Sequence, residues 1–198
     1  MSIDTLILIV IVIYSIILHE IAHGYIAKLC GDKTAERAGR LTLNPIPHID
    51  IFGSVILPVI AVLSGWGVFG WAKGVPVNPY NLNTRFKEFA VSAAGIATNL
   101  LIATLFLLLI KFGVFPNIYN ELFIRIAIIN IGLGFFNLLP IPPFDGMQIL
   151  RSIFPSLKHR YQFIEYNPML MIIMVLFAGY IFSLFYSDLI TFILNIFF

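Results

Sequence analysis

Charged residues are scarce in this chain. Asp, Glu, Lys and Arg make up 11% of its 198 residues, whereas an average soluble protein carries about 25%. The hydrophobic residue types reach 60%, so too few polar side chains are left to cover a water-exposed surface. This scarcity excludes an ordinary soluble enzyme, a nucleic-acid-binding protein and a disordered chain. What remains is a polytopic membrane protein.

Other features are also missing. Cys30 is the only cysteine, which excludes an internal disulfide and a cysteine-rich metal cluster. No lysine or arginine precedes Lys28, so the first apolar segment lacks the basic start of a signal peptide, and we expect it to be retained. The sequence has no internal repeat and no polar stretch long enough for a soluble domain. We therefore expect residues 1–198 to form a single membrane-embedded domain.

The long apolar runs predict the membrane helices. Residues 3–29, 88–112, 121–140 and 168–198 are each long enough to cross a bilayer, which takes about 20 apolar residues. The last run fits one tilted helix or a pair of short ones. A shorter run, 49–64, lies between a full span and a re-entrant segment. We expect an all-α membrane protein with about five to six transmembrane helices.

The basic residues indicate how the second segment is arranged. If 49–64 crosses the membrane, the basic residues divide equally between the two sides. If instead 49–77 enters and returns, with Gly67–Val77 as a strand-like return limb, ten basic residues share one side with only two on the other, and positive charge marks the cytosol. The ten are Lys28, Lys33, Arg37, Arg40, Lys73, Arg85, Lys87, Arg151, Lys158 and Arg160; the two are Lys111 and Arg125. We therefore expect a re-entrant hairpin, basic loops in the cytosol and the amino terminus outside.

A metal-binding pattern lies inside the first apolar run. His19 and His23 are four residues apart, so both imidazoles lie on one face of a helix and can bind one Zn²⁺. Glu20 lies beside them, within reach of a water at the metal. A polar cluster that joins helices is the structural alternative, but ionisable groups within membrane helices are usually functional.

A catalytic zinc needs a third protein ligand and an open position for water. Asp145 is the best candidate, because it follows the 121–140 run and the prolines after that run should end the helix and leave Asp145 on an unwound turn. Alone, an aspartate before a glycine is more typical of an ordinary turn. The two parts of the site reach one depth most easily if helices 3–29 and 121–140 run parallel, which again requires 49–77 to return.

The remaining candidates are weaker. His48 lies where the chain should enter the membrane, either as a structural group or as a residue supporting the metal ligands. His159 lies in a basic loop and is expected to be solvated. Cys30 follows the first helix and is expected to pack rather than to bind metal.

These motifs resemble the site-2 protease family of intramembrane zinc metalloproteases, in its compact prokaryotic branch without added soluble domains. The resemblance covers about residues 15–150. It is carried by five segments: H-E-x-x-H at 19–23, N-x-x-P-x-P-x-x-D-G at 137–146, a glycine–asparagine segment at 92–99, and the stretches 39–50 and 70–79.

The resemblance implies hydrolysis of peptide bonds within or near transmembrane segments of membrane proteins. It implies one Zn²⁺ per chain on His19, His23 and Asp145, Glu20 as the catalytic base, and Asn99 or Asn137 stabilising the oxyanion. The implied partners are a transmembrane protein or peptide substrate and the lipid bilayer of a prokaryotic plasma membrane, with no nucleic acid. The oligomeric state stays open.

Two alternatives from other classes use the same residues. A membrane metal-ion transporter would use the His/Asp cluster as a transit site, although it could do without Glu20 and would favour several such clusters. A catalytically silent relative would only bind membrane helices, although it would have no need for an intact H-E-x-x-H motif.

Overall fold

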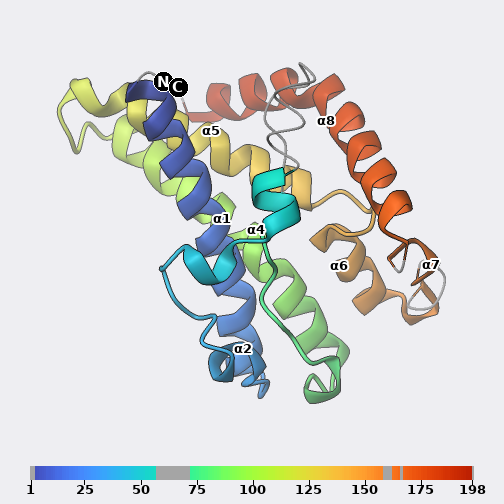
Figure 1. The fold of residues 1–198 in the computed structure, drawn as a ribbon. Helices are drawn as coiled ribbons and strands as arrows, with labels where there is room; N and C mark the ends of the chain where they lie inside the picture. Colours follow the sequence, from blue (N-terminus) through green and yellow to red (C-terminus); the bar gives the residue numbers. More distant parts are fainter. Residues whose placement is uncertain (1–2, 57–71, 158–161, 166, 198) are drawn as a thin grey trace.

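The computed structural model describes residues 3–56, 72–157, 162–165 and 167–197 (Figure 1). Within these residues the secondary structure is helical and no strand is present. The long helices are α1 (Ile3–Leu29), α4 (Arg85–Lys111), α5 (Asn120–Asn137) and α8 (Pro168–Phe197). The short ones are α2 (Thr34–Arg37), α6 (Asp145–Ile153), α7 (Gln162–Glu165), the π-helical Ile51–Ile56 and the 3₁₀ turns Ile46–His48, Pro79–Asn81, Asn117–Tyr119 and Pro155–Leu157.

Four helices among the described residues are long and apolar enough to cross a membrane, which confirms an all-α polytopic membrane protein. The prediction of about five to six spans left open whether 49–64 crosses the membrane and whether 168–198 is one helix or two. α8 is one helix from Pro168 to Phe197, which answers the second question. Since α8 has no interior proline and is almost entirely apolar, nothing in its sequence ends the helix part-way.

Local sequence explains where the helices begin and end. The Thr84 hydroxyl accepts a hydrogen bond from the backbone N–H of Lys87 and caps the start of α4. The chain leaves α4 through Gly113, whose φ of 59° suits a residue without a Cβ atom. α5 ends at Asn137, shortly before the first of three prolines, which cannot continue a helix.

α1 and α5 run in the same direction, and α4 runs opposite to both (Figure 1). At one end of the bundle, Ala27 near the end of α1 packs with Val91 near the start of α4. At the other end, Leu107 of α4 packs with Ala127 of α5 and with the last turns of α8. The parallel course of α1 and α5 predicted from the zinc motif is therefore present.

The chain between α1 and α4 leaves and returns at one level of the molecule. The N–H of Lys73 donates to the carbonyl of His48 over 2.9 Å, so the two ends of the intervening segment meet. Residues 57–71 lie outside the described residues, and the re-entrant hairpin with its strand-like return limb stays a prediction for that stretch.

A buried aspartate fixes the base of this region. The Asp32 carboxylate accepts hydrogen bonds from the backbone N–H of Thr34 and Asn78 and from the side chains of Thr34 and Asn81. Burial opposes the charged form, but these donors outweigh it and lower the pKa of Asp32. The bonds join the end of α1 to the chain that leads into α4.

Candidate metal centre

Three side chains from two helices meet in the interior. His19 Nε2 lies 3.1 Å and His23 Nε2 lies 3.2 Å from Asp145 Oδ2, and the two Nε2 atoms are 3.1 Å apart. Both imidazoles are buried. Among the described residues this is the only group of at least three His, Cys, Asp or Glu side chains whose ligand atoms are close enough to hold one metal ion.

Hydrogen bonds to the two Nδ1 atoms determine which nitrogen of each imidazole presents a lone pair to Asp145. His23 Nδ1 lies 2.7 Å from the carbonyl oxygen of Val91, which can only accept, so Nδ1 carries a proton and Nε2 of the neutral imidazole carries the lone pair. His19 Nδ1 lies 2.8 Å from Asn99 Oδ1 and donates in the same way. Two imidazole lone pairs and a carboxylate oxygen therefore converge, an arrangement that requires a positive charge among them.

Asp145 reaches the cluster from the first turn of a separate helix. The prediction of an unwound turn at Asp145 is wrong: α5 ends at Asn137, three residues before the end of the predicted 121–140 helix, and α6 begins at Asp145. The start of α6 packs directly on the chain leaving α5, because a Cβ atom on Gly146 would lie 2.1 Å from the carbonyl oxygen of Leu138. Glycine at 146 thus allows the close approach that carries Asp145 to the histidines.

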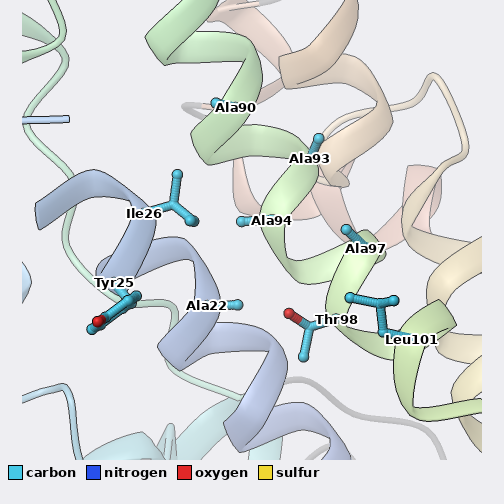
Figure 2. Close-up of a pocket in the computed structure, with 9 residues that line it drawn as sticks. All are labelled: Ala22, Tyr25, Ile26, Ala90, Ala93, Ala94, Ala97, Thr98 and Leu101. Carbon is cyan, nitrogen blue, oxygen red and sulfur yellow. The ribbon is translucent and has the colours of Figure 1, made fainter. Parts of the chain in front are cut away.

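α4 leaves a space beside the two imidazoles. A Cβ atom on Gly95 would lie 2.5 Å from both His19 Nε2 and His23 Nε2. Small residues continue along the seam between α1 and α4, where an apolar groove has a volume of about 380 Å³. Figure 2 shows the side chains that line it. The groove is lined by Ala22, Tyr25 and Ile26 of α1 and by Ala90, Ala93, Ala94, Ala97, Thr98 and Leu101 of α4. Small side chains let the two helices approach closely, which brings Gly95 against the histidines.

The three ligand atoms fit zinc. Ligands about 2.0–2.1 Å from a tetrahedral zinc ion lie about 3.3 Å from one another, close to the observed 3.1–3.2 Å. Asp145 Oδ2 is buried and has no hydrogen-bond partner among the described residues, as expected of a metal ligand. The set of two imidazoles and one carboxylate is also a typical catalytic zinc set that leaves a position open for water.

Glu20 points to the returning chain rather than to another helix. Its Oε2 accepts a hydrogen bond of 2.8 Å from the backbone N–H of Val75. The same chain passes closely at Gly74, where a Cβ atom would lie 3.7 Å from Glu20 Oε2. The carboxylate is thus held beside His19 and His23 by a backbone donor from the 72–78 stretch.

Asn99 and Asn137 lie in different surroundings. Asn99 is fully buried; its carbonyl oxygen accepts from His19 and its amide donates to Asn130 over 3.2 Å. Because both ends of its amide are engaged behind His19, its contacts favour a positioning role over the predicted oxyanion role. The Asn137 amide donates to the carbonyl of Leu133 in its own helix.

His48 makes no contact with the ligands among the interactions described. It is buried, its Nε2 bonds to the carbonyl of Thr42, and its own carbonyl accepts from Lys73. It therefore supports the stretch that carries Val75. Cys30 packs at the end of α1 beside Ala27, as expected. His159 lies outside the described residues.

Several groups at the centre were not assigned from the sequence. The Val91 carbonyl, the Val75 N–H, Gly95 and Asn130 become visible only when the helices are packed. For Gly95 a signal existed, since a glycine within a run of small residues on a membrane helix often marks a close contact. Asn130 also carried a signal, because a polar side chain inside an apolar helix requires a partner.

The model of peptidase family M50 matches residues 7–123 and 114–181. The chain belongs to peptidase family M50. This is the site-2 protease family, so the resemblance seen in the sequence is confirmed.

Proteins named as zinc metalloproteases are similar over most of this chain. YwhC of Bacillus subtilis is 37% identical over 158 residues, covering 75% of this chain and 69% of that protein. Rip2 of Mycolicibacterium smegmatis is 35% identical over 135 residues, covering 67% and 51%. Rip2 of Mycobacterium tuberculosis is 33% identical over 140 residues, covering 69% and 52%. The chain thus spans about half the length of the Rip2 proteins.

No solved structure matches the chain. The family assignment and the relatives' names support the predicted activity, that of a zinc metalloprotease within the membrane. Nothing in them favours the metal-ion transporter.

Proposed function

We propose that this chain, as one membrane-embedded domain, hydrolyses peptide bonds within or near transmembrane segments of membrane proteins. In this proposal His19, His23 and Asp145 hold one zinc ion and Glu20 is the catalytic base. The observation that supports it most strongly is the convergence of three lone-pair atoms, 3.1–3.2 Å apart, beside the space left by Gly95.

The metal ligands and Glu20 have separate roles in the proposed hydrolysis. When bound, a zinc ion lowers the pKa of water toward about 7 and polarises the substrate carbonyl. Glu20 accepts the proton of the attacking water and then delivers it to the leaving amine. The Val75 N–H holds one carboxylate oxygen of Glu20, and we assign the proton transfer to the other oxygen.

The substrate has to be extended where it is cut, because a helix hides its carbonyls in hydrogen bonds. We propose that the 72–78 stretch pairs with it by strand addition. Lys73 and Val75 use their N–H groups to bind His48 and Glu20. Strand addition would therefore use backbone groups of the stretch other than these two N–H groups.

We further propose that the end of α1 and the start of α4 face the cytosol. The ten-to-two division of basic residues supports this orientation, as does the return of the chain at His48 and Lys73. The loop between α4 and α5 would then lie outside. In a Cys30→Ala background, a cysteine introduced at Ile118, which is 83% exposed, should react with an impermeant reagent added to intact cells. Reaction only after lysis would contradict the orientation.

Metal removal tests the proposal. Purified protein reconstituted with a single-span substrate should lose cleavage when zinc is stripped by a chelator and regain it when Zn²⁺ is returned. Mg²⁺ should not restore it, because imidazole ligands suit zinc and Mg²⁺ prefers oxygen. Zinc content should follow activity, rising to about one ion per chain. Cleavage that persists in protein verified to be free of metal would refute the proposal.

A further inference from the structure

A chain of buried amides connects His19 to a backbone carbonyl on another helix. Asn99 of α4 lies between His19 and Asn130 of α5, and both asparagines have no exposed surface. The Asn130 amide donates to Ser15 of α1 and to the carbonyl of Ile126, over 2.9 Å in each case. These hydrogen bonds join three helices within the membrane.

The network has only one consistent direction. The Ile126 carbonyl can only accept, so the NH₂ group of Asn130 must face it and Asn130 Oδ1 must face Asn99. Asn99 then presents its NH₂ group to Asn130 and its oxygen to His19. The proton of neutral His19 must therefore lie on Nδ1, which leaves Nε2 free for a metal.

The reverse direction would disable the site. If Asn130 turned its amide over, its oxygen would face the Ile126 carbonyl and Asn99 would present NH₂ to His19. His19 would then carry its proton on Nε2, aimed at Asp145 Oδ2 only 3.1 Å away. A direct His19–Asp145 hydrogen bond would form in place of metal binding. Among the hydrogen bonds described for this network, the one to the Ile126 carbonyl opposes this form.

We propose that Asn130 is a positioning residue that fixes the metal-binding tautomer of His19 through Asn99. The Val91 carbonyl fixes the tautomer of His23 directly, because it accepts the proton on His23 Nδ1. Within the described part of the chain, His19 Nδ1 bonds to the Asn99 side chain rather than to a backbone carbonyl, and the Ile126 carbonyl of α5 acts on it through Asn130 and Asn99. Groups behind a metal ligand that fix its tautomer typically change metal affinity by about 10–100-fold when removed.

Two variants separate this role from packing. Asn130→Leu keeps the volume but removes the polarity, so we expect its zinc affinity, measured by chelator competition, to fall by about 10–100-fold. Ser15→Ala removes the other partner of the Asn130 amide but leaves the Ile126 carbonyl to direct it, so its affinity should change by less than about threefold. Equal affinities in wild type and Asn130→Leu, or equal losses in the two variants, would overturn the proposal.

The tautomer can also be read without a variant. ¹⁵N NMR of the imidazoles in metal-free wild-type protein should show a proton on His19 Nδ1, and that proton should be partly lost in Asn130→Leu. A wild-type His19 without a proton on Nδ1 would overturn the inference. The inference rests on the proposed role of His19 as a zinc ligand, but different results would contradict the two. Wild-type protein that binds no zinc would contradict the proposed function. The spectrum of metal-free protein tests only the tautomer of His19.

Discussion

Glu20→Gln is expected to reduce cleavage of a reconstituted single-span substrate by about 10³-fold, within the range of about 10²–10⁴-fold for loss of a general base. The glutamine carbonyl can still accept the Val75 N–H that holds Glu20 Oε2 in the wild type. The side chain should therefore stay in place, and only its ability to take a proton should be lost. Zinc content should remain at about one ion per chain, because Glu20 is not among the ligands.

Glu36→Gln is the matched control. Glu36 is exposed on α2 and forms an ion pair with Lys28 over 2.6 Å, and exposed pairs of this kind contribute about 1 kcal/mol or less. Its cleavage rate should equal that of the wild type. The experiment also tests the transporter alternative, because zinc transport into vesicles would survive Glu20→Gln. Undiminished cleavage by Glu20→Gln would exclude Glu20 as the base.

Gly95→Ala is expected to weaken zinc binding by at least about 100-fold without unfolding the protein. The added Cβ atom would lie 2.5 Å from His19 Nε2 and His23 Nε2, so both imidazoles would have to move from the positions in which they meet Asp145. Displacements of about 1 Å at a catalytic site can cost about 100-fold in rate, and we expect at least that loss in zinc affinity and in cleavage. Alanine also favours a helix more than glycine does, by about 1 kcal/mol, so α4 itself should not be weakened.

The control for Gly95→Ala lies on α8. A Cβ atom on Gly179 would meet nothing within 4 Å, so Gly179→Ala makes the same chemical change in open space. It should bind zinc and cleave substrate as the wild type does. Normal zinc content in Gly95→Ala would show that the space beside the imidazoles is not needed for the metal.

The part of the site that depends on the spacing of nearby residues could be predicted from the sequence. A four-residue separation on a helix fixes the relation of His19 and His23 before any packing is known, and the bounds of α1 match the predicted 3–29 run. The distribution of basic residues gave the parallel course of α1 and α5. Asp145 was found because its distance from the prolines placed it at the end of α5.

What the sequence could not provide depends on contacts between helices. The partner of the Glu20 carboxylate is a backbone N–H 55 residues away, and backbone groups carry no sequence signal. Asn99 was assigned to the oxyanion, whereas its contacts run to His19 and Asn130, 80 and 31 residues away. The helix at Asp145 was missed because three prolines indicate a break but do not say where the next helix begins.

X-ray absorption at the zinc edge of the purified wild-type protein tests the central claim most directly. The account predicts one zinc ion per chain with only nitrogen and oxygen ligands at about 2.0–2.2 Å, two of them with the outer-shell scattering of imidazole. A sulfur ligand at about 2.3 Å, a single imidazole or none, or protein that cleaves its substrate with no zinc would contradict it.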